Sequence, residues 1–252
     1  MSISLQGKTA LITGASSGIG EAVAVALAEL GANLILVARR LDRLNELADR
    51  ISTGHSVNVT VIQLDIRDSS TVSSLLSNLP SPVDILVNNA GLALDSLKIQ
   101  DGITVSWDTM IDTNLKGLLY VTNTLLPVMV DRGIGHVVNI GSIAGHDHYP
   151  VGNVYSATKH AVKALTQSMR IDLLGTGVRA TEISPGATHT EFSEVRWKDK
   201  EKADKYYKSI KPLAPSDVAD AVVYAVTRPL HVDVAQMVIY PSIQASCNHA
   251  IK

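Results

Sequence analysis

Tyr155 and Lys159, four residues apart, form the pair of side chains with the clearest capacity for chemistry in this chain. A phenol has a reference pKa of about 10, too high for a base at neutral pH, but a nearby ammonium stabilises the phenolate. A tyrosine beside a lysine could therefore act as an acid/base couple. The same spacing also arises by chance on ordinary helices, so the elements around the pair must decide between the two interpretations.

Apolar side chains recur at helical spacing over residues 153–174, and they are Val162, Leu165, Met169 and Leu173. This period predicts a helix with those side chains toward the core. Because residues four apart lie one turn apart on a helix, Tyr155 and Lys159 would share a face.

Short apolar runs alternate with longer helical patterns along the chain, which predicts repeated βαβ units. We therefore expect an α/β fold: a single-domain Rossmann fold over residues 1–252, with a doubly wound, seven-stranded parallel sheet and helices on both faces. The first helix is expected over residues 18–30, and a substrate lid at about 187–211, within the polar and least regular stretch 185–211. The strands are expected at residues 8–13, 33–38, 57–64, 84–88, 135–141, 178–184 and 236–240.

Small and polar residues stand where several of these strands end. Ser142 follows the fifth strand, residues 88–91 end the fourth, and Pro185 with Gly186 ends the sixth. Ligands of open parallel sheets bind outside the carboxyl ends of the strands. We expect these residues to meet at one edge, where the Ser142 hydroxyl could bond a reacting oxygen.

A glycine-rich stretch, residues 13–20 (Thr-Gly-Ala-Ser-Ser-Gly-Ile-Gly), joins the first strand to the first helix. Glycines allow a tight turn and close backbone approach, and a helix N-terminus favours a pyrophosphate. A P-loop is excluded because Glu21 and Ala22 follow, not Lys and Ser or Thr. A hydrolase elbow through Gly-x-Ser-x-Gly is disfavoured, since the motif opens the first βαβ unit. The predicted dinucleotide contacts in this loop are Gly14, Ser16, Ser17, Gly18, Ile19 and Gly20.

Arg39 and Arg40 end the second strand, where an NAD site would present a carboxylate to the ribose. Guanidinium groups pair with a 2′-phosphate, so the cofactor predicted is NADP. The alternative is a pair of solvated arginines that contact Asp42 or Glu46. Asp65, at the end of the third strand, is either an adenine contact or a turn residue.

Composition excludes several classes of function. The net charge of -2 and the 18% of charged residues give no basic surface for nucleic acid. Cys247 is the single cysteine and cannot form an internal disulfide, and no apolar run approaches the length of a membrane span, so we expect a cytoplasmic protein. His146 and His148 have metal-compatible spacing, but no third ligand is spaced to complete a site, and no metal is predicted.

The chain resembles the short-chain dehydrogenase/reductase family over essentially its full length, through residues 13–20, 88–91, Asn114, Ser142, Tyr155, Lys159 and 185–186. The resemblance implies that Tyr155 exchanges the hydroxyl proton and Ser142 orients the substrate oxygen. Lys159 would bind the nicotinamide ribose and depress the tyrosine pKa, and Asn114 would hold a proton-relaying water. Further cofactor contacts would be Ile66, Asn89, Ala90, Gly91, Pro185, Gly186 and Thr188.

Longer stretches are similar to the NADP-dependent 3-hydroxy acid (serine or allo-threonine) dehydrogenases of that family: residues 89–94, 110–114, 139–145, 152–155, 190–193 and 195–196. That subgroup implies a homotetramer and oxidation of the 3-hydroxyl of a small acid such as serine, allo-threonine or a 3-hydroxybutyrate-like compound. Arg196, in the expected lid, is the candidate to bind the substrate carboxylate. The alternative for Arg196 is a solvated basic helix face.

Two other functions remain open at this point. One is an NADPH-dependent ketone or aldehyde reductase of the same fold that acts on a less polar, biosynthetic carbonyl. The other is a sensor that binds NADPH without turnover, against which the intact set Ser142, Tyr155 and Lys159 argues. Neither the physiological direction nor the stereochemistry at the substrate carbon follows from the sequence.

Overall fold

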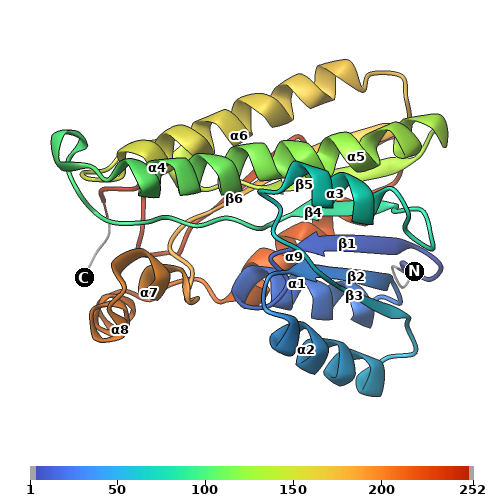
Figure 1. The fold of residues 1–252 in the computed structure, drawn as a ribbon, viewed down its shortest axis with the longest axis horizontal. Coiled ribbons are helices and arrows are strands. Elements are labelled where there is room, and N and C mark those ends of the chain that lie inside the picture. The colour runs from blue at the N-terminus through green and yellow to red at the C-terminus, as the bar shows by residue number, and fades with distance from the viewer. Residues whose placement is uncertain (1–3, 250–252) are drawn as a thin grey trace.

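A computed structural model describes residues 4–249 of the chain. Within these residues seven parallel strands form one sheet in the order β3-β2-β1-β4-β5-β6-β7 (Figure 1). The chain runs outward from β1 to β3 and then returns to place β4 beside β1. The strand order therefore reverses between β1 and β4, the point at which doubly wound sheets bind ligands. The strands are β1 (Thr9–Thr13), β2 (Asn33–Ala38), β3 (Val59–Gln63), β4 (Ile85–Asn88), β5 (Gly135–Ile140), β6 (Val178–Pro185) and β7 (Gln236–Ile239).

Helices cover both faces of this sheet (Figure 1). One face carries α1 (Gly18–Glu29), α2 (Leu41–Gly54) and α9 (Pro215–Val226). The other carries α3 (Ser69–Leu76), α5 (Leu118–Asp131) and α6 (Asn153–Asp172), and α4 (Thr104–Ile111) packs against α6. Short turns complete the fold: η1 (Ile99–Asp101), the π-helical η2 (Asp112–Gly117) and η3 (Ile143–Gly145).

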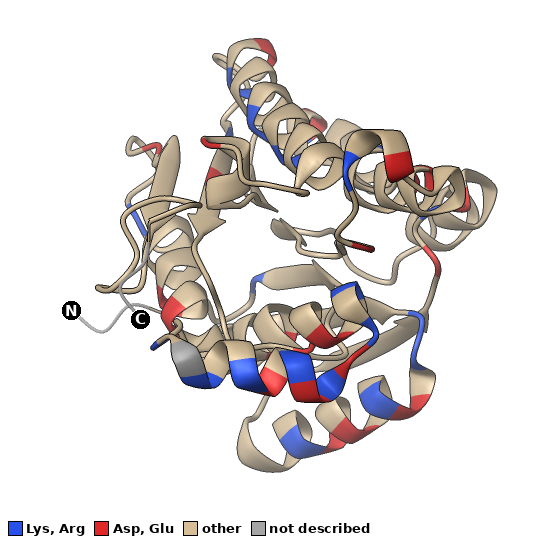
Figure 2. Ribbon diagram, turned by 90° about the vertical axis from the view of Figure 1, so that its left-hand side faces the viewer, with Lys and Arg blue, Asp and Glu red and all other residues tan. Residues whose placement is uncertain are grey.

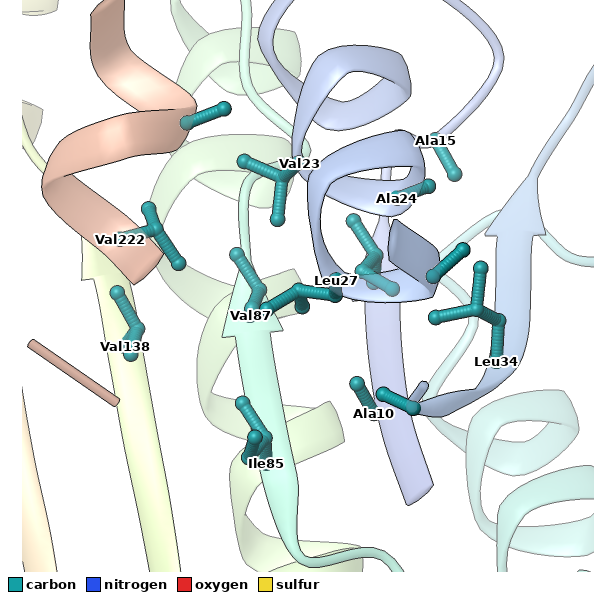
Figure 3. Packing of buried hydrophobic residues seen from close by; sticks show 14 of the residues in the cluster. Ala10, Ala15, Val23, Ala24, Leu27, Leu34, Ile85, Val87, Val138 and Val222 are labelled. Carbon is teal, nitrogen blue, oxygen red and sulfur yellow. The ribbon is translucent and has the colours of Figure 1, made fainter. Parts of the chain in front are cut away.

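The apolar core lies in two layers, one on each side of the sheet. Along β1, Ala10 and Ile12 face the α1 and α9 side, whereas Leu11 between them faces the α5 and α6 side. Alternate residues of a strand point to opposite faces, so a strand covered on both sides must be apolar throughout. Figure 3 shows the first layer, where Val23 and Leu27 of α1 pack with side chains of α9, β1, β2, β4 and β5.

The structure confirms the predicted fold class, the sheet and the order of its elements. β2 has the predicted bounds, and the other strands differ from theirs by one or two residues at an end. None of the helices in residues 4–249 has the length and apolarity needed to cross a membrane.

The stretch predicted as a substrate lid, residues 187–211, contains two helices, α7 (Phe192–Trp197) and α8 (Lys200–Ser209). Asp199 caps α8 by accepting a hydrogen bond from the Lys202 backbone at 2.9 Å. Opposite charges stand four residues apart along the helix, as in Glu201 and Lys205, which favours the helix without apolar periodicity. Figure 2 shows Lys and Arg interspersed with Asp and Glu along the helices that face the viewer.

Candidate active site

The glycine-rich loop makes a left-handed turn directly before α1. Gly14 and Gly18 have φ angles of 66° and 59°, values that side-chain-bearing residues rarely adopt. A Cβ at Gly20 would lie 2.4 Å from the Gly14 oxygen, so only glycine fits where the helix meets the loop. Ser17 precedes the helix, and its side chain makes no capping hydrogen bond. The first amides of α1 are therefore free to bind an anion such as a pyrophosphate.

Arg40 extends from the end of β2 over this loop. Its Nη2 donates hydrogen bonds to Ser17 Oγ at 2.7 Å and to Ser16 Oγ at 3.0 Å. Its Nη1 donates to Glu191 Oε2 at 2.8 Å, and Arg43 donates to the other oxygen of the same carboxylate. The carboxylate that Arg40 contacts is thus Glu191 of the lid, not Asp42 or Glu46.

The Glu191 carboxylate is held in its charged form by the two arginines. Burial raises its pKa, but the hydrogen bonds from Arg43 and Arg40 outweigh burial and lower the pKa to about 2. Two guanidinium groups thus share one carboxylate next to the glycine-rich loop, and guanidinium groups are suited to pair with phosphate. Arg39 is exposed, and it lines the same cavity as Arg40 and the glycine-rich loop.

Asp65 follows β3, the strand next to β2 at the edge of the sheet. Its Oδ2 accepts a hydrogen bond from Arg67 Nη2 at 2.6 Å, and that bond lowers the Asp65 pKa. Asp65 is therefore both a turn residue, which accepts from the Arg67 backbone, and part of the cavity wall, so the two interpretations are compatible.

A cavity of about 760 Å³ runs along the carboxyl ends of the strands and joins the glycine loop to Tyr155. It brings together nearly all the predicted site residues; Gly20 and Asn114 are buried behind its wall. The predicted residues on the wall are Gly14, Ser16, Ser17, Gly18, Ile19, Arg39, Arg40, Asp65, Ile66, Asn89, Ala90, Gly91, Ser142, Tyr155, Lys159, Pro185, Gly186, Thr188 and Arg196.

Tyr155, Lys159 and Ser142 meet where α6 passes the end of β5. The Lys159 ammonium is buried, donates to the Ile140 backbone oxygen at 2.8 Å, and lies 5.9 Å from the centre of the Tyr155 ring. Ser142 begins the η3 turn by accepting a hydrogen bond from the Ala144 amide at 3.1 Å. Burial lowers the pKa of Lys159 to about 8, against the opposing effect of the Glu182 charge.

The structure does not show the lowered pKa that the resemblance implies for Tyr155. Burial raises the pKa of Tyr155, and the Tyr149 phenol raises it further. Ser142, through a hydrogen bond, and Arg196, through its charge, act in the opposite direction but do not outweigh burial.

Asn114 lies in the π-helical turn η2, a local widening that often marks functional positions. Its Nδ2 donates to Leu92 O at 2.8 Å and to Thr158 Oγ1 at 3.1 Å, and its Oδ1 accepts from Leu92 N at 2.8 Å. The amide therefore ties the loop after β4 to α6 beside Lys159. These contacts commit the side chain to positioning that loop.

Arg196 lies on the lid helix α7 and reaches across the cavity. Its Nη1 donates to the Tyr149 hydroxyl at 3.0 Å, its Nε donates to the Asp95 oxygen at 3.3 Å, and its guanidinium lies 5.1 Å from the centre of the Tyr149 ring. Arg196 is thus a partly buried cavity residue and not a solvated one. Phe192 of the same helix packs on Tyr155, with ring centres 5.4 Å apart.

His146 and His148 point to different partners. His146 Nε2 lies 3.1 Å from Ser184 Oγ, whereas His148 stacks on His160 with ring centres 4.8 Å apart. In the part of the chain that the structure describes, no three His, Cys, Asp or Glu side chains are grouped to hold a metal.

Sequence reasoning missed several residues on the cavity or next to it. Glu191 and Arg43 are about 150 positions apart in the chain, and only the fold brings them together. Tyr149 gave no signal beyond its place after the fifth strand. Glu182 lies in the predicted sixth strand, where it alternates with Val178 and Ala180 on one face, but a polar residue in a strand that also contains Arg179, Thr181 and Ser184 gave no specific signal.

The chain belongs to the short-chain dehydrogenase family, whose sequence model matches residues 8–201. It is 40% identical to an NADP-dependent 3-hydroxy acid dehydrogenase of Schizosaccharomyces pombe, with 98% of each chain covered. It is 45% identical to sulfoacetaldehyde reductase 2 of Chromohalobacter salexigens, with 93% of this chain and 94% of the other covered. Its fold matches the closed form of a serine dehydrogenase complexed with NADP+ at a TM-score of 0.91 and 42% identity, over 97% of this chain and 99% of that one.

Gly20→Ala should disrupt the loop, because the added Cβ would meet the Gly14 oxygen and the Asn89 side chain at 2.4 and 2.5 Å. We expect the free energy of unfolding to fall by about 1–3 kcal/mol. The matched control is Gly54→Ala, which meets nothing within 4 Å and should change stability by less than about 1 kcal/mol. Urea unfolding measures the free energy of unfolding of both variants. Equal values for the two would refute the explanation that the close approach of Gly14 and Asn89 requires glycine at position 20.

Proposed function

We propose that the protein is an NADP-dependent oxidoreductase that transfers a hydride between the nicotinamide and the 3-hydroxyl or 3-oxo carbon of a small hydroxy acid, such as serine, allo-threonine or a 3-hydroxybutyrate-like compound. The relatives named 3-hydroxy acid dehydrogenase and serine dehydrogenase support this proposal, since they align over nearly the whole chain. The acid/base pair, the phosphate loop and a cation in one cavity support it independently.

The residues present fit such a dinucleotide. The uncapped N-terminus of α1 suits the pyrophosphate, and the glycines that a Cβ would obstruct allow the backbone to approach it closely. Arg40 suits the 2′-phosphate, with Arg39 beside it, and Asp65 and Ile66 would border the adenine. Pro185, Gly186, Thr188 and the loop 89–91 would enclose the nicotinamide half. When bound, the dinucleotide supplies the hydride donor or acceptor.

The chain's own side chains would handle the proton and the orientation of the substrate. Tyr155 would exchange the proton of the substrate hydroxyl at its Oη, and Ser142 Oγ would bond the same oxygen. Lys159 would bind the nicotinamide ribose hydroxyls, and its charge would favour the phenolate once the site is filled. Asn114, whose Oδ1 accepts one hydrogen bond from Leu92 N and has a second lone pair, would hold a water that relays protons to solvent.

One observation supports an acid as the substrate: Arg196 lines the same cavity as Tyr155 and Ser142. Its guanidinium is held by Tyr149 and by the Asp95 backbone, so the cation is preorganised at the substrate end. A fixed guanidinium pairs in bidentate fashion with a carboxylate, and equally with a sulfonate. The second relative, a sulfoacetaldehyde reductase, makes an acidic aldehyde the strongest competing substrate.

A substrate panel tests this assignment. Purified protein with NADP should form NADPH with serine, allo-threonine or 3-hydroxybutyrate. Arg196→Leu should raise KM for these acids by about 10- to 100-fold, because the charged hydrogen bonds are lost. The control Arg228→Leu, outside the cavity, should leave KM unchanged. Consumption of NADPH with sulfoacetaldehyde but not with 3-oxo acids, or with neutral ketones alone, would replace the proposed substrate.

Arg40→Ala should weaken NADP binding by about 10- to 100-fold and NAD binding far less, since only NADP carries the phosphate that the guanidinium would contact. Arg50→Ala is the matched control. Arg40 precedes α2, whereas Arg50 lies within α2 and pairs with Glu21 away from the cavity. Fluorescence titration of both variants with NADP and with NAD gives the dissociation constants, from which the loss of affinity for each nucleotide is calculated. Equal losses for NADP and NAD would remove Arg40 from the 2′-phosphate site.

We also propose a homotetramer located in the cytoplasm. Apolar side chains that stay exposed on α4, α5 and α6 support association: Val105, Val128 and Ile171 are 71%, 50% and 76% exposed. Light scattering on the purified protein should report the mass of four chains, and a monomeric mass would contradict the assembly.

A further inference from the structure

We propose that Glu182 is a positioning residue whose buried negative charge keeps Lys159 protonated and aimed at the end of β5. The inference deepens the proposed function, on which the role of Lys159 rests. It concerns a side chain that does not line the cavity and that therefore acts only through others.

Glu182 lies beneath α6, on the same side of the sheet as Lys159. Along β6, Val178 and Ala180 pack with the α6 side of the core, and alternation places Glu182 on that face too. The side chain is 1% exposed. A carboxylate buried to this extent must be compensated by hydrogen bonds and opposite charge, or it would destabilise the fold.

The carboxylate packs directly against the segment that carries the catalytic groups. A Cβ at Gly141 would lie 2.3 Å from Glu182 Oε1, so glycine at that position makes room for the charge. Gly141 stands between Ile140, whose oxygen accepts from Lys159, and Ser142. A change in the Glu182 charge therefore acts at the point where Lys159 is anchored.

A chain of hydrogen bonds with one direction ends on Glu182. Lys163 Nζ lies 3.2 Å from His146 Nδ1, and because an ammonium only donates, Nδ1 accepts and the ring proton sits on Nε2. His146 Nε2 then donates to Ser184 Oγ at 3.1 Å, and the Ser184 hydroxyl donates to Glu182 Oε1 at 2.6 Å. Gln236 Nε2 donates to the other carboxylate oxygen. Every described bond supplies a donor, as an ionised acceptor requires.

The charges that face this carboxylate come from two elements. Helix α6 contributes Lys159 and Lys163, which are four residues apart on one face. The turn after β5 contributes His146, whose Nε2 lies 3.6 Å from Glu182 Oε1. His160 of α6 acts on His146 through its charge. Tyr155 faces Lys159 from its own helix. Burial lowers the pKa of His146, so near neutral pH its imidazole is uncharged. An uncharged ring can accept at Nδ1 and donate at Nε2, as the hydrogen bonds require. The Glu182 charge raises the pKa of Lys159 against burial.

A double-mutant cycle on the cofactor-free protein tests the coupling. Unfolding free energies are measured for the wild type, Glu182→Gln, Lys159→Met and the double variant, at pH 6.5 and pH 9.5. The two residues should be coupled favourably at pH 6.5, and the coupling should be lost at pH 9.5, above the Lys159 pKa of about 8. The control cycle pairs Glu182→Gln with Lys116→Met, whose lysine contacts Asp112 on the surface, and should show no coupling at either pH. A coupling that is absent, or equal at both pH values, overturns the proposal.

The pH profile of turnover supplies a second measurement. In Glu182→Gln the alkaline limb of kcat, where Lys159 loses its proton, should move to lower pH by about one unit, because the stabilising negative charge is gone. Glu182→Asp keeps the charge and should restore the wild-type limb, which a purely structural role would not produce. An unmoved limb overturns the proposal. The cycle needs no substrate, so coupling without turnover on hydroxy acids would refute the proposed function and leave Glu182 in its role.

Discussion

The ammonium of Lys159 has to remain charged in a place from which water is largely excluded, and much of the site is built around that constraint. An isolated charge in a protein interior is costly unless hydrogen bonds and an opposite charge accompany it. Here the Ile140 carbonyl supplies the bond, and Glu182 supplies the charge from the neighbouring strand. From the end of β4, Gly91 borders the ammonium: a Cβ there would lie 3.6 Å from it, an ordinary van der Waals distance. The ends of β4, β5 and β6 thus hold one side chain of α6.

Contacts of the lid join the surroundings of Tyr155 and Lys159 to both ends of the cavity. Helix α7 is anchored at the nucleotide end by Glu191 on Arg40 and Arg43, and at the substrate end by Arg196 on Tyr149. Trp197 adds a bond to Ser96 at 3.0 Å, and Phe192 packs on Tyr155 between the two ends. Because Glu191 and the short helix that follows it make all these contacts, the positions of the proposed phosphate-binding and substrate-binding groups are linked. Such preorganisation is what brings reacting groups into a productive geometry.

Much of the fold follows from local patterns that a single sequence displays. The apolar runs of β1, β2, β4 and β5 are buried on both faces, so each is recognisable without knowledge of its neighbours. The glycine loop and the Tyr155–Lys159 spacing are equally local, and parallel strands bring their carboxyl ends to a common edge. The candidate site could therefore be predicted from chain order and strand ends.

What could not be predicted depends on tertiary contacts. The pairing of Arg40 with Glu191 spans 151 positions, and no periodicity announces it. Helix α8 arises from a cap and from charge spacing, signals that are weak beside apolar periodicity. The raised pKa of Tyr155 reflects burial of the phenol, which is not a property of spacing along a helix.

The central claim is that Tyr155 exchanges the proton of the reaction in this cavity, and Tyr155→Phe tests it most directly because it removes the phenol oxygen and little volume. Nucleotide binding and the rate of hydride transfer should both be measured on the same preparation. The account predicts unchanged nucleotide affinity with a rate at least about 10²-fold lower than that of the wild type. A variant that binds the nucleotide and keeps the wild-type rate would contradict it.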